Sequence, residues 1–587
     1  MIRTLRRSFA LPLLAAAWLV SAAAASAQAT WTEEDTRATL GSLRTLTLAP
    51  DLDHLGPGER EAVELLLQAG RVFQELYEDQ LHPDAAWARE HLTEGSPEAT
   101  LYRLFRGPVG TNLANQRVPF LHVRPELPGK NVYPLDVTRG ELEGWLDAHP
   151  AERPAVLDTR TVVRRATGES LSRDLAVLEA HPGLRLLHPG LQERLEELLR
   201  APSHERFYAV PYAVAYAGRL LRVRELLLEA ARAVRDEDPD FADYLRLRAG
   251  DLLTSDYEAG DAAWVSGSFD DLNAQIGSYE TYDDALFGVK AFFSLSLLVR
   301  DRERTAELQA ALTDIQEIEN SLPYDRTKQV RSRIPVGVYR VIADFGQARG
   351  TNTATILPND PDHARKYGRT ILLRYNIMTE PTLFESSRAR FCAAVAERHC
   401  ADLTMEGNFQ RTLWHEIGHY LGVDRTADGR TLDEALSSVA NLYEEMKADL
   451  VSLFAAGQLH ERGFYSDDEL RSFYAGGILR VLQSGEPRRD QPYQTMQLMQ
   501  WNWFMDQGLL TLEDGRLVID YDRYPEAVES LLREVLAIQS AGDFARAEAF
   551  VERWTAWDPA VHGVVAGAVA AAPGGGITLV RYEALDG

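Results

Sequence analysis

Cysteine is nearly absent from this sequence. Only Cys392 and Cys400 occur among 587 residues, too few for a zinc site built on thiolates, which uses three or four ligands from cysteine and histidine. The segment Arg390-Phe391-Cys392 matches no nucleophile motif. In an exported protein the two cysteines can close a small loop as a disulfide, and the alternative is a pair of free buried thiols. A metal site in this chain therefore has to use nitrogen and oxygen ligands.

Basic residues are in the minority as well. Lys and Arg number 62 against 88 Asp and Glu, and the formal net charge is −26. Binding along a phosphate backbone needs a basic face, so we expect no nucleic-acid partner. Hydrophobic residues make up 45% and charged residues 26%, which is typical of a soluble globular protein. At roughly 100–200 residues per domain, the length predicts two or more lobes.

Long apolar runs are confined to the N-terminus. A basic start with Arg3, Arg6 and Arg7 precedes the apolar run Phe9–Val20, and small residues at 25–29 offer two overlapping cleavage sites. This pattern predicts a secretory signal over residues 1–29 and hence an exported protein, periplasmic or secreted. A membrane-anchoring helix is the alternative. No later segment reaches the roughly 18 apolar residues that a membrane span needs, so we expect no stable membrane anchor after cleavage.

The pattern of apolar and polar residues changes along the chain. Residues 30–253 are mostly helical in pattern, with apolar residues three and four apart. A mixed α/β centre follows at 254–400, then a helical region at 401–510 and a C-terminal helix with short strands at 511–587. Together these patterns predict a predominantly helical α+β protein. The clearest predicted helices are Glu59–Gln80, Leu191–Arg200, Ala213–Val234 and Phe241–Leu253, and the clearest strands are Pro335–Asp344, Thr370–Ile377, Leu517–Tyr521 and Ile577–Tyr582.

One motif in the third region points to chemistry. The run His415-Glu416-Ile417-Gly418-His419 is a His-Glu-x-x-His motif. On a helix, residues four apart share one face, so both imidazoles can bind one metal while Glu416 takes a proton from a metal-bound water. Asn408 is the predicted cap of this helix and Gly422 its end. The alternative is a pair of surface histidines beside an acid.

A second acidic motif follows within Leu432–Phe454, which reads as one long helix. Glu445 can supply the third protein ligand that a catalytic zinc requires. Asp449 lies four residues on, where a carboxylate can hold the outer N–H of a ligand histidine. The alternative is an ordinary solvated helix face. Two imidazoles and a carboxylate favour one Zn²⁺ per chain; non-haem iron uses a similar set but has no evident need of Glu416.

These motifs resemble the dipeptidyl peptidase III family. Glu444-Glu445-Met446-Lys447-Ala448-Asp449 is similar to its Glu-Glu-x-Arg-Ala-Glu/Asp motif, and Ile276–Gly288 is similar to its Ile-Gly-x-x-Glu-x-Tyr-x-Asp segment. Leu357–Asp360 and Leu373–Asn376 resemble the segments that hold the peptide. The resemblance covers residues 251–508 and implies two lobes with a wide substrate cleft, the zinc lying on the helical lobe.

The resemblance also implies a role for each matching residue. His415, His419 and Glu445 become the zinc ligands, Glu416 the general base, and Glu444 and Asp449 the carboxylates behind the histidines. Asn359 becomes a candidate for binding the backbone or free amine of the peptide. The further candidates for binding substrate or stabilising the oxyanion are Asn376, Tyr279, Tyr282, Arg374 and Tyr375.

Three departures from the family pattern stand out. The first motif has five residues, where the best-known members have His-Glu-x-x-Gly-His. Gln275 stands where the family places a tyrosine, and the stretch Gln494–Trp501 lacks the histidine of the family's His-Met-Gln segment. Its Met and Trp content favours a buried helix. The donor that stabilises the transition state is therefore not identified by the motifs.

The sequence thus predicts a zinc metallopeptidase. The first hypothesis is an exopeptidase that releases dipeptides from the N-terminus of short peptides. Two alternatives remain: a zinc aminopeptidase or endopeptidase of different specificity, and a non-catalytic exported peptide-binding protein. An intact Glu416 argues against the last, because a purely structural metal site needs no base.

Overall fold

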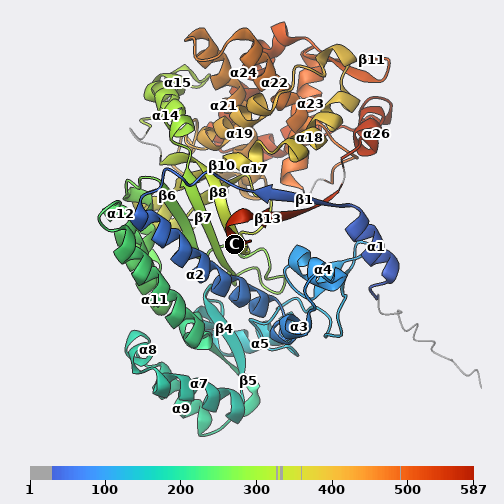
Figure 1. Ribbon diagram of the computed structural model, residues 1–587. Helices are drawn as coiled ribbons and strands as arrows, with labels where there is room; N and C mark the ends of the chain where they lie inside the picture. The colour runs from blue at the N-terminus through green and yellow to red at the C-terminus, as the bar shows by residue number, and fades with distance from the viewer. Residues whose placement is uncertain are drawn as a thin grey trace, which may run out of the picture.

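Two hydrophobic cores organise the chain in a computed structural model (Figure 1). The structure describes residues 30–325, 328–330, 335–358, 360–488, 491–574 and 576–586. One core joins residues between Leu46 and Ile377 with Val580 and Tyr582 from the C-terminal end. The other joins residues between Leu308 and Val569. Each core therefore combines distant parts of the chain, which form a lower and an upper lobe in Figure 1.

The lower lobe is built mainly from the first half of the chain. Its longest helix, α2, carries the predicted apolar stripe and buries Phe73 and Leu76 completely. Its helices are α1 (Glu33–Gly41), α2 (Pro57–Leu81), α3 (Ala85–His91), α4 (Pro97–Phe105), α5 (Arg139–Ala148), α6 (Arg153–Val156), α7 (Gly168–Ala180), α8 (Pro182–Leu187), α9 (Leu191–Leu199), α10 (Tyr212–Ala215), α11 (Ala217–Val234), α12 (Pro239–Thr254) and α13 (Glu258–Ser266).

A five-stranded sheet lies between the two cores. Its order is β6-β7-β8-β10-β9, and all neighbours are antiparallel except β8 and β10. Successive side chains of a strand point to opposite faces: Leu372 of β10 joins the lower core, while Ile371 and Leu373 join the upper core. The strands are β6 (Leu272–Ser278), β7 (Phe293–Arg300), β8 (Val336–Gly346), β9 (Ala354–Leu357) and β10 (Thr370–Arg374).

The upper lobe is almost entirely helical. Its central helices α19 and α21 pack against each other and are surrounded by α22, α23 and α24. Helix α16 (Pro361–Tyr367) contacts α13 of the lower lobe. The other helices of this half of the chain are α14 (Arg302–Ala311), α15 (Ile315–Ser321), α17 (Tyr375–Met378), α18 (Pro381–Ala394), α19 (Met405–Gly418), α20 (Leu432–Leu436), α21 (Ala440–Glu461), α22 (Asp467–Val481), α23 (Pro492–Asp506), α24 (Tyr524–Ala541), α25 (Phe544–Trp554) and α26 (Val564–Ala571).

Four two-stranded ladders complete the fold. One of them pairs β1 with β13 in parallel, so the two ends of the described chain meet beside the sheet (Figure 1). The pairs are β1 (Leu43–Leu48) with β13 (Ile577–Tyr582), β2 (Val109–Thr111) with β3 (Arg117–Pro119), β4 (Thr161–Ala166) with β5 (Ser203–Pro211), and β11 (Leu510–Glu513) with β12 (Arg516–Ile519).

The predicted elements agree with the structure in kind and differ at several boundaries. The predicted helix Leu432–Phe454 is wrong as a single helix: α20 and α21 are separated at Ser437, whose φ of 49° no α-helix accepts. The predicted strand Thr370–Ile377 ends at Arg374, where α17 begins. The two cysteines, left open by the sequence, are bonded, with Cα atoms 4.8 Å apart.

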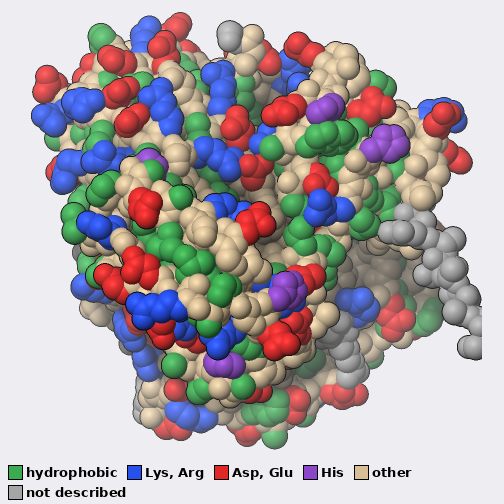
Figure 2. Space-filling view, turned by 90° about the horizontal axis from the view of Figure 1, so that it is seen from below, with side chains coloured by type: hydrophobic (Ala, Val, Ile, Leu, Met, Phe, Trp, Pro, Cys, Tyr) green, Lys and Arg blue, Asp and Glu red, His purple; other side chains and the backbone are tan. Residues whose placement is uncertain are grey.

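The surface and the helices agree with the composition. Figure 2 views the molecule from below, and acidic and basic side chains lie interspersed over the face that it shows. Among the described residues, none of the helices combines the length and the apolar character that crossing a membrane requires. The predicted signal over residues 1–29 lies outside the described residues.

Candidate metal centre in the cleft between the lobes

Helix α19 presents both histidines of the first motif on one face. Thr404, not the predicted Asn408, caps it, because the Thr404 hydroxyl accepts a hydrogen bond from the Gly407 amide. The helix ends at Gly418, so the predicted end at Gly422 is wrong by one turn. Leu413 and Ile417 on the opposite face are buried in the upper core. Burying that face aims the motif outward, toward the cleft.

Glycine within the motif lets α21 come close. A Cβ atom at Gly418 would lie 2.7 Å from the carbonyl oxygen of Ala448, so a larger residue would push the two helices apart. Since Ala448 lies within the second acidic motif, this close crossing brings Glu444, Glu445 and Asp449 to the histidines. The middle of the His-Glu-x-x-His motif thus serves packing as well as chemistry.

Three side chains converge on one point. His415, His419 and Glu445 each offer a ligand atom, and these atoms lie within 4.8 Å of one another. Nε2 of His415 is 3.3 Å and Nε2 of His419 is 4.0 Å from Oε2 of Glu445. A tetrahedral ion with bonds of about 2.0–2.1 Å holds its ligand atoms about 3.3–3.4 Å apart. The three donors therefore surround a point that a small divalent cation such as Zn²⁺ can occupy once the more distant of them move inward.

Carboxylates stand behind both imidazoles. Nδ1 of His415 lies 2.7 Å from Oδ1 of Asp449, and Nδ1 of His419 lies 3.1 Å from Oε1 of Glu444. A carboxylate on the outer nitrogen orients the ring and leaves Nε2 to act as the metal ligand. Glu444 and Asp449 are the residues for which the motif resemblance implies this role.

Cations balance these acids. Arg411 contacts Oδ1 of Asp449 at 3.0 Å and Arg480 contacts Oδ2 at 3.4 Å, while Lys447 donates to Glu444 at 2.8 Å. None of the three was predicted as part of the site. Arg411 has a sequence signal, since it lies one helical turn before His415 on the same face. Arg480 has none, because only the packing of α22 against α19 brings it near.

The charges of the site shift the pKa values of its groups. Burial lowers the pKa of His415, but the Asp449 carboxylate outweighs burial and raises the pKa to about 9. Burial raises the pKa of Glu444, but Lys447 and His419 outweigh it and lower the pKa to about 2. Burial likewise raises the pKa of Glu445, and His415 and His419 bring it below its ordinary value. The carboxylates are thus ionised at neutral pH and attract a cation, and His415 has to give up its proton to bind it.

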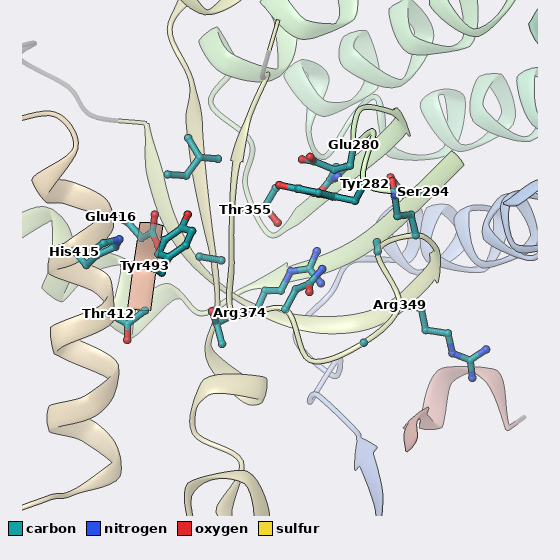
Figure 3. A pocket seen from close by; sticks show the side chains of 18 of the residues that line it. Glu280, Tyr282, Ser294, Arg349, Thr355, Arg374, Thr412, His415, Glu416 and Tyr493 are labelled. Atoms are coloured by element: carbon teal, nitrogen blue, oxygen red, sulfur yellow. The ribbon is translucent and has the colours of Figure 1, made fainter. Parts of the chain in front are cut away.

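The site opens into a cavity of about 910 Å³ between the lobes. His415, Glu416 and Tyr493 lie together on one side of it in Figure 3, and Glu280, Tyr282 and Ser294 lie across from them. The cavity is within the range of about 300–1,000 Å³ that is usual for ligand sites. Glu416 therefore faces the space that a substrate would fill.

The predicted residues in and behind the opposite wall are mostly engaged in the fold. Tyr282 is 85% exposed and lines the cavity. Tyr279 is buried and donates to Asp261. Arg374 lines the cavity, but its guanidinium donates to Asp344 at 2.8 Å and Ser296 at 2.7 Å. The Asn376 amide exchanges two hydrogen bonds with the backbone of Val341.

Two further candidates lie apart from this wall. Tyr375 contacts Arg304 and Glu406, and it is not among the residues that line the cavity. Asn359 lies outside the described residues. Its predicted role in binding the peptide stays a prediction.

Tyr493 is the cleft residue that sequence reasoning missed. Its hydroxyl donates to Oε1 of Glu445 at 3.1 Å, and its side chain is 46% exposed. Burial and the Glu445 carboxylate raise the pKa of Tyr493 to about 12, so the phenol keeps its proton. It begins α23, the helix that buries Met496, Met499 and Trp501 as predicted. No local pattern connects a tyrosine to an acid 48 residues away.

Known proteins share this fold. No family model matches the chain. The structure of dipeptidyl peptidase III from Caldithrix abyssi aligns with a TM-score of 0.78 at 23% identity, covering 94% of this chain and 99% of that one. The structure of dipeptidyl-peptidase III from Corallococcus sp. strain EGB aligns with a TM-score of 0.69 at 24% identity, covering 94% and 97%.

A curated relative carries a different name. Nudix hydrolase 3 from Arabidopsis thaliana is 26% identical in an alignment of 545 positions, which covers 85% of this chain and 67% of that protein. The structural likenesses establish the fold: the chain has the two-lobed fold of dipeptidyl peptidase III structures, as the motif resemblance predicted.

Proposed function

We propose that this protein is a zinc-dependent peptide hydrolase that releases dipeptides from the N-terminus of short peptides. The observation that carries the proposal is the convergence of His415, His419 and Glu445 at the cleft, with Glu416 beside them. The fold shared with dipeptidyl peptidase III structures supports both the reaction type and the substrate class. A cavity of about 910 Å³ suits a short peptide better than a folded protein.

Each residue has a chemical task in this proposal. His415, His419 and Glu445 would hold the ion, which when bound supplies Lewis-acid polarisation and lowers the pKa of water toward about 7. Asp449 and Glu444 keep the two imidazoles oriented through their Nδ1 atoms. Glu416 accepts the proton of the attacking water and passes it to the leaving amine nitrogen as the C–N bond breaks.

Metal content and product size test the proposal together. We expect the purified protein to contain one zinc per chain and to cleave dipeptidyl arylamides, with cleavage lost on chelation and restored by zinc. Mass spectrometry of a digested peptide mixture should show losses of two N-terminal residues. Iron in place of zinc, or no cleavage of any short peptide by the zinc-loaded protein, would contradict the proposal.

The same assay separates the alternatives. Release of single residues indicates an aminopeptidase, and internal cuts indicate an endopeptidase. Stoichiometric zinc and peptide binding without any cleavage indicate a peptide-binding protein. The position of Glu416 in the cavity lining favours hydrolysis over the last alternative.

We further propose that the protein is exported, on the strength of the N-terminal pattern alone. Expression of the full chain should yield a mature protein that begins near residue 28 or 30, in the periplasm or the medium. Intact mass measurement decides this. An uncleaved chain that stays in the cytoplasm contradicts the proposal and leaves the peptidase proposal untouched.

A further inference from the structure

A second cavity lies on the lower lobe, outside the cleft between the lobes. It has a volume of about 630 Å³ and lies between the end of α7, the short helix α8, and the helices α11 and α12. We call it the α8 groove. None of its lining residues lines the cavity at the metal donors. Figure 1 shows α8 at the lower left, below α11 and away from the sheet. The groove therefore has no part in the function proposed above.

The lining of the α8 groove is almost entirely apolar. Leu184 and Leu253 of this lining are buried, whereas Leu186 is 78% exposed and Leu187 is 42% exposed. Leaving two adjacent leucines in water is unfavourable, and contiguous exposed apolar surface marks a binding site more often than a lone leucine does. The volume is within the range of about 300–1,000 Å³ that is usual for ligand sites. The groove thus has the size and the surface to bind an apolar group.

Gly250 leaves room in the α8 groove. It lies within α12, where glycine is less favourable than alanine. A Cβ atom at Gly250 would meet no other heavy atom within 4 Å, and its φ is not positive, so neither packing nor the backbone of the fold requires glycine here. Because Gly250 belongs to the lining, the absent side chain leaves open space in the groove.

Arg224 of α11 places a positive charge in this apolar lining. It is partly buried, and no carboxylate of the described residues forms an ion pair with it. Its own helix offers none, because the residues one turn before and after it are the leucines Leu220, Leu221, Leu227 and Leu228. A partly desolvated guanidinium without a counter-charge is stabilised by an anion. In a chain with 88 acidic and 62 basic residues, this lack of an acid partner is notable.

We infer that the α8 groove binds a long-chain fatty acid. The acyl chain would cover the leucines and fill the space at Gly250, and the carboxylate would accept two hydrogen bonds from the Arg224 guanidinium. A ligand rich in polar groups fits less well, because His181 and Thr254 are the other polar side chains of the lining and the Thr254 hydroxyl already donates to the Asp251 carbonyl oxygen. The inference does not depend on the peptidase function.

Calorimetric titration of the full protein with dodecanoate, kept below its critical micelle concentration, tests the binding. We expect one site per chain. Butanoate has the same head and a short chain, so it should bind at least about tenfold weaker. Dodecyltrimethylammonium has the same chain and the opposite charge, and it should also bind at least about tenfold weaker, because Arg224 repels it.

Two variants locate the site. Gly250→Phe fills the groove and should abolish dodecanoate binding while keeping the thermal unfolding midpoint, because its Cβ meets no neighbour. Arg224→Met removes the charge and keeps an apolar chain, so dodecanoate should bind at least about tenfold weaker. Arg222→Met is the matched control, since Arg222 lies on the same helix, contacts Glu225 at 3.4 Å and does not line the groove. It should bind dodecanoate as the wild type does.

Four results would overturn the inference. Dodecanoate that shows no saturable binding, or that binds both groove variants like the wild type, does not occupy the α8 groove. Dodecyltrimethylammonium that binds as tightly as dodecanoate removes the role of Arg224. Binding to phosphatidylglycerol vesicles that Leu186→Ser abolishes, without binding of free dodecanoate, assigns the exposed leucines to a membrane surface. A dimer that Leu186→Ser disrupts, again without binding of dodecanoate, assigns them to a second copy of the chain.

Discussion

The two walls of the cleft are built differently. On the upper wall, α19 and α21 place the motif residues by helical spacing, and their side chains meet in the cavity. On the lower wall, Arg374 lies where the sheet meets a short helix and bonds to Asp344, and the nearby Asn376, which is not among the residues that line the cavity, bonds to the backbone of Val341. The comparison teaches that the spacing of a motif on one helix face predicts where its side chains point, whereas a motif at the end of a strand does not.

The largest effect should come from the base on the upper wall. Glu416→Gln removes the proton acceptor but leaves the three metal donors, so we expect kcat to fall by about 10²–10⁴-fold with zinc retained. Steady-state kinetics measure kcat, and metal analysis measures the zinc content. Glu461→Gln, at the exposed end of α21, is the matched control. Unchanged turnover in Glu416→Gln would remove this residue from the mechanism.

A substitution on the lower wall should lower the stability of the protein. Arg374→Met leaves the fully buried Asp344 carboxylate without its cation, at a cost of about 3–5 kcal/mol in unfolding free energy. Denaturant unfolding measures this. The double variant Arg374→Met/Asp344→Asn should regain most of the loss, because no buried charge remains unpaired. If Arg374→Met alone keeps the native stability and has a greatly raised KM, then Arg374 binds the substrate. The two walls would then not differ in the way described.

Removing a carboxylate behind a histidine should have an intermediate effect. Glu444→Gln weakens the hold on His419, and we expect zinc affinity or activity to fall by about 10–100-fold. Glu444 is a better choice than Asp449, because Asp449 is buried and pairs with both Arg411 and Arg480, whereas the Glu444 side chain is 30% exposed and pairs with one cation, Lys447. Competition with a chelator of known affinity measures the zinc affinity of the variant. A zinc affinity equal to that of the wild type would show that Glu444 does not support His419 as a ligand.

The smallest effect should come from the exposed residue of the lower wall. Tyr282→Phe removes one hydroxyl that reaches the cavity from a side chain that is 85% exposed. A lost hydrogen bond to the peptide costs about 1 kcal/mol, or about fivefold in KM, with kcat nearly unchanged. A large loss of kcat would instead show that Tyr282 takes part in the reaction itself.

Local patterns predicted the site better than its surroundings. The spacing of His415 and His419 and the phase of Glu445 and Asp449 are properties of single helices, so the sequence sufficed for them. The break at Ser437 was missed, because a positive φ at a serine leaves no compositional mark. Arg480 and Tyr493 were missed because α22 and α23 meet the site only through the packing of the upper core.

The lower lobe shows the same limit. Its long helices α2 and α12 match the predicted ranges within a few residues, whereas the predicted helix Ala213–Val234 is divided at Tyr216 into α10 and α11. The pairing of β1 with β13 joins strands more than 500 residues apart. Such a pairing depends on the whole fold, so the sequence of either strand alone does not predict its partner.

Anomalous diffraction at the zinc edge tests the central claim most directly. We expect crystals of the zinc-loaded protein to show one strong peak about 2.0–2.2 Å from Nε2 of His415, Nε2 of His419 and a carboxylate oxygen of Glu445. A peak at another set of residues, or zinc bound to the two histidines with Glu445 turned away, would contradict the account.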